Sequence, residues 1–189
     1  RDAKFKLFKA ANRHKSGRQL GIVNADDDNA IHFAEATKYN MAYSLKPTDD
    51  PAVAYPKNLK LTPTSSSYTA TINGVDIDIT CNIPGSYNVA NSLAAANVGA
   101  AMGIDAKTIG KGIAALKTVE GRMNTIDEGQ DFNVIIDYAH TPDSFEKLFA
   151  DLRPVVKGRL ISLFGSAGRR DVTKRAVQGE LAGKYSDIV

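Results

Sequence analysis

One aspartate and one histidine interrupt an apolar run in the last third of the chain. The segment NVIIDYAHTPDSFEKLF, residues 133–149, predicts a buried strand, a break at Asp137 and His140, and then a helix. An aspartate at such a break can hold a metal ion or accept a hydrogen bond from a ribose hydroxyl or an amine, and a histidine can donate to a phosphate or stack beside a base. Alternatively, both side chains only tie down the turn. The residues alone leave both possibilities open.

A glycine loop after the next apolar run is the second candidate. The loop FGSAG, residues 164–168, begins at the last residue of the apolar run RLISLF and precedes a predicted helix, so its backbone N–H groups could bind an anion. Basic residues lie just beyond it, and arginine can grip a carboxylate or phosphate with two hydrogen bonds. They are Arg169, Arg170, Lys174 and Arg175. The loop matches neither GxGxxG nor GxxxxGK[ST], so a solvated basic surface is the competing interpretation.

Two asparagines form the third candidate. Asn88 and Asn91 stand three residues apart at the start of an alanine-rich predicted helix, which places them on one helix face. Their amides could hydrogen-bond an adenine edge or order a nearby loop. As an isolated pair they are also compatible with local capping.

The elements before residue 120 must position the asparagines. The pattern predicts a helix, the strand QLGIVN and a weak helix AIHFAEATK, followed by two alternating runs that meet at Asn73-Gly74, a strong signal for a tight hairpin turn. We expect Val75, Ile77 and Ile79 to face the core. A pair of packed helices follows; Ser86 is a possible N-cap of the first and Asp105 caps the second.

The elements after residue 121 must position the other two candidates. The polar segment KTVEGRMNTIDEGQD indicates a domain boundary near Gly121. Strand, helix, strand, helix and strand then alternate, with Thr141 as N-cap and Pro142 as first residue of the first helix. We therefore predict an α/β fold with a Rossmann-like parallel sheet, in which ligands bind beyond the carboxyl ends of the strands.

Bulk composition limits the class of protein. The 189 residues, 43% of them hydrophobic, can bury a sizeable core in one or two domains. No apolar run approaches the roughly 20 residues needed to cross a bilayer, and the first residues lack a signal-peptide pattern. The single cysteine, Cys81, excludes a disulfide framework and fits a reducing cytoplasm. A formal charge of +3 is too small to imply a nucleic-acid partner.

Four segments, taken in order, resemble one family. GSYNVANSLAAA, VEGRM, VIIDYAHTPDSFEKL and LFGSAGRRDVTKR are similar to Mur ligases, with DYAHTPD the most specific part, and the likeness runs from end to end. Both ends read as cut, so we expect an excerpt. The resemblance implies that residues 1–120 are the second half of a central ATPase domain whose P-loop is absent here. Residues 121–189 would be the first half of a Rossmann-like, amino-acid-binding C-terminal domain.

The resemblance also implies roles for individual residues. Lys4 would carry a carbamate that ligates or orients magnesium, and Lys4, Asp137 and His140 would serve catalysis. The ATP contacts implied are Asn88, Asn91, Arg122, Asp137 and His140. The amino-acid contacts implied are Arg170 together with Asp171, Lys174 and Arg175. The loop departs from the commonest family pattern by having Ala167, Gly168 and Arg169 before Arg170, and Ala176 after the basic pair.

The activity implied by the resemblance is ATP-dependent amide ligation. The likeness is greatest to members that add the third peptide residue, L-lysine or meso-diaminopimelate, to UDP-N-acetylmuramoyl-L-alanyl-D-glutamate through an acyl phosphate. ATP and magnesium would be the cofactors. The whole enzyme would be cytoplasmic and monomeric, without nucleic-acid or membrane partners, and would serve peptidoglycan biosynthesis and hence cell shape and division. We expect the excerpt alone to be inactive.

Three other interpretations stay open. Another ligase of the superfamily, such as a folylpolyglutamate synthase, would share the chemistry. A ligase-like substrate-binding subunit of an amidotransferase would need a zinc-binding cysteine cluster that one cysteine cannot supply. A nucleic-acid-binding module built on GRRDVTKR would need interleaved aromatic residues and a higher net charge.

Overall fold

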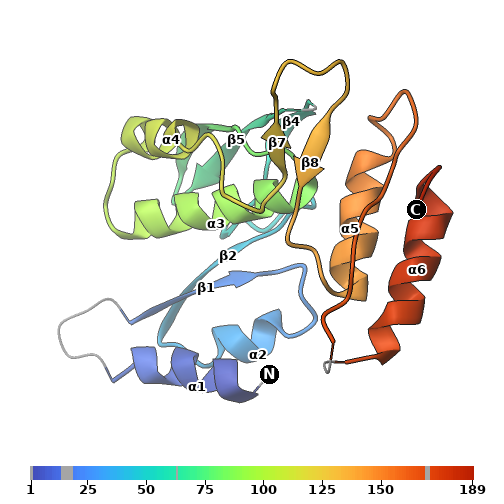
Figure 1. Cartoon of the computed structure of the whole chain (residues 1–189). Helices are drawn as coiled ribbons and strands as arrows, with labels where there is room; N and C mark the ends of the chain where they lie inside the picture. Colours follow the sequence, from blue (N-terminus) through green and yellow to red (C-terminus); the bar gives the residue numbers. More distant parts are fainter. Residues whose placement is uncertain (1, 14–18, 63, 169–170) are drawn as a thin grey trace. The chain divides into compact units, whose positions relative to one another are not determined.

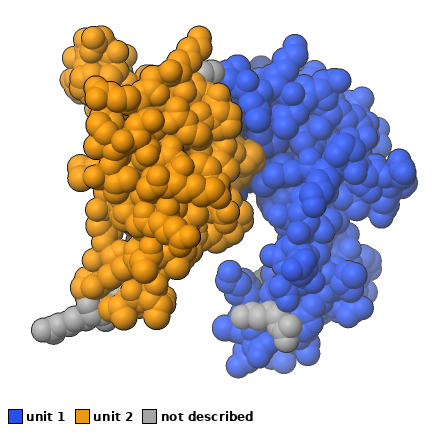
Figure 2. Space-filling model, turned by 90° about the vertical axis from the view of Figure 1, so that its right-hand side faces the viewer, with its two compact units in different colours: residues 1–84, 88–117 blue, residues 85–87, 118–189 orange. Residues whose placement is uncertain are grey.

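The computed structural model describes residues 2–13, 19–62, 64–168 and 171–189. The chain divides into two compact units, coloured separately in Figure 2. Unit 1 comprises residues 1–84 and 88–117, and unit 2 comprises residues 85–87 and 118–189. Within the described residues, none of the helices is both long and apolar enough to cross a membrane.

Unit 1 begins with a three-stranded parallel sheet. The strands β1 (Leu20–Asn24), β2 (Tyr39–Tyr43) and β3 (Val53–Ala54) lie in that order. Helices α1 (Asp2–Ala11) and α2 (Ala30–Ala34) lie together on one side of it (Figure 1). Aromatic contacts join these helices: Phe5 stacks on His32 with ring centres 4.1 Å apart, and Phe8 packs against Phe33 at 5.0 Å. The predicted strand QLGIVN is confirmed; the weak helix predicted over AIHFAEATK is present but ends at Ala34.

An antiparallel sheet follows in unit 1. It contains β4 (Lys57–Leu61), β5 (Ser66–Ile72) and β6 (Val75–Cys81). The predicted tight turn is confirmed, because Asn73 and Gly74 have φ of 53° and 76°, as a two-residue type I′ turn requires.

The hairpin corrects one core assignment. Ile77 and Ile79 are buried as expected, but Val75 is 52% exposed, so its predicted place in the core is wrong. Val75 shares a sheet face with the buried Ile72, its partner across the turn. It stands, however, at the tip of the hairpin on the edge strand, whereas Ile72 lies on the central strand.

Two helices complete unit 1. They are α3 (Ser86–Ala101), whose first two residues fall in unit 2, and α4 (Ala106–Ala115), which Asp105 caps by accepting from the Thr108 N–H as predicted. The two helices pack closely where Gly99 meets Ile109: an added Cβ at Gly99 would lie 2.9 Å from Ile109 Cγ1. The core joins both helices to the antiparallel sheet and consists of Ala54, Tyr68, Ala70, Ile72, Ile77, Ile79, Val89, Leu93, Ala96 and Ile109.

Unit 2 combines a short hairpin with two helices. Strands β7 (Asn124–Ile126) and β8 (Val134–Ile136) pair antiparallel. Helices α5 (Pro142–Leu152) and α6 (Thr173–Tyr185) lie side by side (Figure 1) and bury Phe145, Phe149 and Ala182 between them. The predicted start of α5, with Thr141 as N-cap and Pro142 as first residue, is confirmed.

Parallel pairing in unit 2 is short. Ile161 and Ile188 form a parallel bridge, supported by Ser162 N donating to Ile188 O at 2.9 Å and Asp187 N donating to Leu160 O at 2.8 Å. Within the described residues, the segment RLISLF carries this bridge instead of a regular strand, and β8 pairs with the unpredicted β7. All three residues of β8 are exposed, so the prediction that this strand is buried is wrong. The mixed α/β class is as predicted, with its regular parallel sheet in unit 1.

Candidate functional site

The turn that carries Arg122 is bonded to the end of β8. Gly121 and Met123 both have positive φ, 69° and 49°, so Arg122 lies between two left-handed residues. Tyr138 N donates to Gly121 O at 2.7 Å, and Met123 N donates to Asp137 Oδ2 at 2.9 Å. The second bond stabilises a backbone conformation that costs energy for a residue with a side chain. The turn places the Arg122 guanidinium carbon 5.7 Å from the centre of the Tyr138 ring.

The Asp137 carboxylate is engaged by the chain itself. Besides the bond from Met123, Oδ1 accepts from Ala139 N at 2.8 Å and Oδ2 accepts from the Tyr87 hydroxyl at 3.4 Å. Burial, and then the negative charge of Asp137, raise the pKa of the Tyr87 phenol well above its usual range. Asp137 therefore holds the turn before α5 through its bond from Ala139 N, as one of the two interpretations of the sequence proposed. It also bonds Tyr87, which lies 50 positions away in the sequence.

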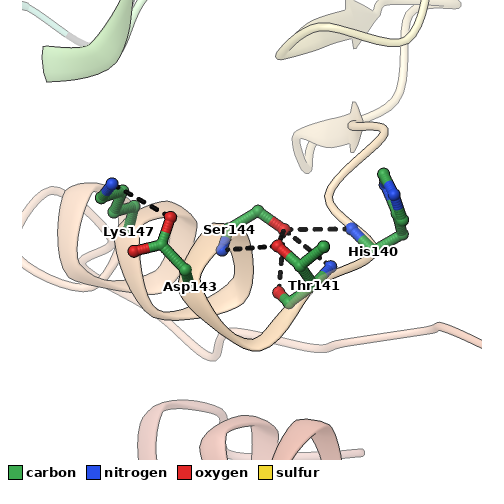
Figure 3. A network of polar contacts seen from close by, with 5 residues as sticks. All are labelled: His140, Thr141, Asp143, Ser144 and Lys147. Atoms are coloured by element: carbon green, nitrogen blue, oxygen red, sulfur yellow. Dashed lines mark hydrogen bonds and ion pairs between the residues drawn. The ribbon is translucent and has the colours of Figure 1, made fainter. Parts of the chain in front are cut away.

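His140 differs from Asp137 because its ring is exposed (Figure 3). Its Nδ1 lies 3.0 Å from the Tyr138 carbonyl oxygen, which accepts a hydrogen bond in the tautomer that carries its proton on Nδ1. The His140 backbone is held from both sides: its N–H donates to Ser144 Oγ at 3.1 Å, and its carbonyl accepts from Lys174 Nζ at 2.9 Å. A fixed backbone thus presents an accessible imidazole beside the Tyr138 ring, with ring centres 5.0 Å apart.

The first turn of α5 explains why the chain folds this way after His140. Thr141 Oγ1 accepts from Ser144 N at 3.2 Å, and Ser144 Oγ accepts from Thr141 N at 2.9 Å, which completes a reciprocal capping box (Figure 3). Asp143 and Lys147 add an exposed ion pair at 3.0 Å on the same helix. The local sequence TPDS therefore fixes where the helix begins.

The N-terminal end of α6 contacts two loops. Lys174 donates to the His140 carbonyl, as described above, and Arg175 Nη2 donates to Ala167 O of the glycine loop at 3.4 Å. Asp171 Oδ1 accepts from both the N–H and the hydroxyl of Thr173, and these bonds lower the pKa of the Asp171 carboxyl. Arg170, the expected amino-acid contact, and its neighbour Arg169 lie outside the described residues.

The asparagine pair belongs to unit 1. Asn91 Nδ2 donates to Asn88 Oδ1 at 3.1 Å, which confirms that the two amides share a helix face. Asn88 is buried and donates through Nδ2 to Pro84 O at 2.7 Å, so it orders the loop before α3. Asn91 is exposed and is the member of the pair that a ligand can reach.

Lys4 is also in unit 1, exposed on α1, whose Phe5 and Phe8 pack against α2. Among the described residues, no three His, Cys, Asp or Glu side chains gather where they could hold a metal ion. A recess of about 400 Å³ between α1 and β1 is lined mainly by apolar residues such as Leu7 and Leu20, and none of the candidate residues lines it.

The structure brings together the candidates of unit 2. Arg122, His140 and Lys174 are linked by successive contacts through Tyr138 and the His140 backbone. Asp137 joins them through the bond that it accepts from Met123 N, beside Arg122. Sequence reasoning missed Tyr138, although it lies inside DYAHTPD, between two residues that were singled out. Tyr87 was missed as well, and nothing in its sequence context signals a bond to a residue 50 positions away.

The mixed α/β fold is that of the Mur ligases. The MurF structure from Acinetobacter baumannii superposes with a TM-score of 0.78 at 21% identity, covering 97% of this chain and 39% of that one. A complex of FPGS with AMPPCP and folate superposes with a TM-score of 0.70 at 17% identity, covering 98% of this chain and 45% of that one.

Family models cover most of the sequence. Residues 1–99 match the Mur ligase middle domain, and residues 121–189 match the glutamate ligase domain of Mur ligases. The chain belongs to the Mur ligase family.

Two relatives are more similar in sequence than these structures. The UDP-N-acetylmuramyl-tripeptide synthetase of Borreliella afzelii (strain PKo) is 39% identical over 171 residues, which cover 90% of this chain and 34% of that protein. The UDP-N-acetylmuramoyl-L-alanyl-D-glutamate--2,6-diaminopimelate ligase of Gloeobacter violaceus is 38% identical over 187 residues, which cover 98% and 37%. The chain thus spans about a third of the length of the curated relatives it matches.

Proposed function

We propose that this chain is part of an ATP-dependent ligase that adds an amino acid to UDP-N-acetylmuramoyl-L-alanyl-D-glutamate. Family membership and the names of the two relatives support this activity. The observation that carries it is the cluster in unit 2, where an exposed arginine and an exposed histidine flank the Tyr138 ring at the end of β8. Such a cluster offers positive charge and hydrogen-bond donors to a nucleotide.

The proposal assigns the two parts of the chain to two domains. Residues 1–120 would be the second half of the central ATPase domain, and residues 121–189 the first half of the amino-acid-binding domain. The family matches to residues 1–99 and 121–189 support this division. A phosphate-binding loop of the GxxxxGK[ST] type is absent from the sequence, so nucleotide binding would also need a segment from elsewhere in the whole protein.

The reaction would proceed in two steps. A carboxylate oxygen of the nucleotide-linked dipeptide attacks the γ-phosphorus of ATP, ADP leaves, and an acyl phosphate forms. The amine of the incoming amino acid then attacks the acyl carbon, and the tetrahedral intermediate expels phosphate to leave the amide. Positioning and charge neutralisation would supply most of the catalysis, as in other phosphoryl transfers.

Each group of residues would have its own task. Arg122, Asn91 and His140 would contact the nucleotide, with Asn88 and Asp137 holding the backbone around them. Arg170 would bind the carboxylate of the amino acid. Asp171, Lys174 and Arg175 would be the other side chains of the amino-acid site. We retain Lys4 as the site of a carbamate. Magnesium would be the family's metal cofactor, and the Lys4 carbamate would ligate or orient it beside the phosphates of ATP.

The experiment uses the full-length protein that contains this chain. Purified protein is supplied with ATP, magnesium, the UDP-linked dipeptide, and either L-lysine or meso-diaminopimelate, and phosphate release and product mass are measured. We expect phosphate release that requires both the dipeptide and one of the amino acids. Release with a folate and glutamate instead would favour a folylpolyglutamate synthase, which the FPGS-like fold also allows. No release in any arm would contradict ligase activity.

A further inference from the structure

A buried amide lies on the packed face of α6. Gln178 is 2% exposed, and Ala182, one helical turn further on, is fully buried against Phe145 and Phe149. Burying an amide on such a face costs free energy unless the amide is hydrogen-bonded. A leucine or methionine would fill the position without that cost, so the contact that the Gln178 amide makes is informative.

The contact is to the middle of the glycine loop. Ser166 Oγ donates to Gln178 Oε1 at 2.7 Å. The loop has little other packing near its glycines: in the described structure, an added Cβ at Gly165 or Gly168 would meet no atom within 4 Å. Phe164, at the start of the loop, packs edge-on against Phe145 with ring centres 5.0 Å apart. The centre of the loop is therefore anchored to α6 by the short Ser166–Gln178 bond and by the longer bond from Arg175 Nη2 to Ala167 O at 3.4 Å.

This loop leads directly into Arg169 and Arg170. We propose that Gln178 is a positioning residue for amino-acid binding, which acts by holding Ser166 and thereby the loop of residues 164–168, which precedes Arg170 in the sequence. The inference rests on the proposed function, because that function places the incoming amino acid at Arg170. Gln178 itself is buried and touches no substrate, so its effect should appear in amino-acid affinity and not in affinity for ATP.

Gln178→Met is the primary variant, since it removes the acceptor, nearly conserves side-chain volume, and suits an apolar face. In the full-length ligase we expect the KM for the amino acid to rise about five-fold, as for loss of one neutral hydrogen bond, with the KM for ATP changed less than about two-fold. Ser166→Ala removes the donor and should have a similar effect. The double variant should be no worse than the worse single variant, because both changes break one bond.

Leu181→Met is the matched control. Leu181 packs against the same cluster of Phe145, Phe149 and Ala182, and the change is again volume-conserving. It should leave the amino-acid KM unaltered. Hydrogen exchange provides a readout besides activity: peptides covering residues 164–168 should exchange faster in Gln178→Met than in Leu181→Met, while peptides of α5 should not differ.

The outcomes separate this inference from the proposed function. Arg170→Ala should raise the amino-acid KM about ten-fold or more in the same assay, because it removes a charge-assisted contact. If that variant behaves as expected but Gln178→Met and Ser166→Ala leave the amino-acid KM at the parent value, the positioning role is wrong and the ligase function stands. If the parent protein shows no ligation, the proposed function fails, and unchanged exchange in residues 164–168 would separately overturn the anchoring role.

Discussion

The Tyr138 ring lies between Arg122 and His140, with its centre 5.7 Å from the guanidinium carbon and 5.0 Å from the centre of the imidazole. The ring is 65% exposed, so it orients two exposed side chains without burying them. The cation–π contact restricts Arg122 at modest cost in solvation. The backbone bonds around the cluster fix the Arg122 turn. The contribution of the Tyr138 ring is therefore to orient the Arg122 and His140 side chains.

Replacing Tyr138 tests that orientation. A cation–π contact at an exposed site is worth about 0.5–1 kcal/mol, so Tyr138→Leu should raise the KM for ATP of the full-length protein about two- to five-fold. Tyr138→Phe keeps the ring face and should stay close to the parent. If both variants raised the KM for ATP by the same factor, the hydroxyl and not the ring face would be responsible. No rise in either variant would contradict the orienting role of Tyr138.

Lys4 is the residue whose proposed modification is easiest to test. If Lys4 carries a carbamate, Lys4→Ala should lose nearly all activity, and acetate in the buffer should restore part of it by returning the missing negative charge. Lys6→Ala alters another exposed lysine of the same helix and should retain activity. Restoration by chloride as strong as that by acetate would argue against the carbamate.

At the scale of elements, the sequence predicts the helix N-caps correctly, because the capping hydrogen bonds form between residues that are close in the sequence. Asp105 and Thr141 cap α4 and α5 as predicted, because each cap depends on a neighbour three residues away. Strand β7 was not predicted: its residues lie in a polar, aperiodic segment, and they become a strand through pairing with β8, for example Asn124 with Ile136. Strand β2 likewise depends on its pairing with β1.

The candidate site likewise has features that follow from local sequence and features that depend on tertiary contacts. The shared face of Asn88 and Asn91 follows from helical spacing alone. The bond from Met123 N to Asp137 could not be predicted, because it joins residues 14 positions apart and depends on a positive φ that methionine adopts only in this tertiary setting. Local spacing therefore locates candidate residues, and tertiary contacts decide which of their atoms remain accessible.

The cap of α5 should contribute measurably to stability. Thr141→Ala leaves the Ser144 N–H without its acceptor, and loss of an N-cap typically costs about 1 kcal/mol. We expect a corresponding drop in the free energy of unfolding of the full-length protein, measured with urea, wherever the transition that includes α5 is resolved. Thr141→Ser retains the acceptor and should lie near the parent; a loss as large as that of alanine would remove the cap from the explanation.

The cap of α4 should make stability depend on pH. The Thr108 hydroxyl, followed by the Thr108 N–H, lowers the pKa of the Asp105 carboxyl from its ordinary value of 3.8. A lowered folded-state pKa means that the stabilisation is fully present above the unfolded-state pKa and is lost as the pH falls through the folded-state pKa.

Asp105→Asn keeps a capping side chain that does not titrate. The parent should therefore lose stability relative to Asp105→Asn as the pH is lowered from about 5 to below the ordinary carboxyl pKa, as followed by thermal unfolding. A difference between the two proteins that stays constant across this range would contradict a titrating cap.

At the scale of the whole molecule, the chain corresponds to about a third of its curated relatives. Its candidate residues are divided between two units, with Lys4 and the asparagines in unit 1 and the Arg122, Tyr138 and His140 cluster in unit 2. In the proposed function, the full-length protein catalyses a single reaction that needs both sets of residues. That reaction has a chemical signature independent of any one residue, because an acyl phosphate transfers an oxygen atom from the acceptor carboxylate to phosphate.

Measuring where this oxygen atom goes therefore tests the acyl-phosphate mechanism. The UDP-linked dipeptide is labelled with ¹⁸O in its terminal carboxylate, the full-length protein is supplied with ATP and the amino acid, and released phosphate is analysed by mass spectrometry. We predict one ¹⁸O atom in each phosphate derived from labelled carboxylate, together with ADP and the amide product. Amide formation with unlabelled phosphate, or with the label in AMP, would contradict the acyl-phosphate ligase proposed here.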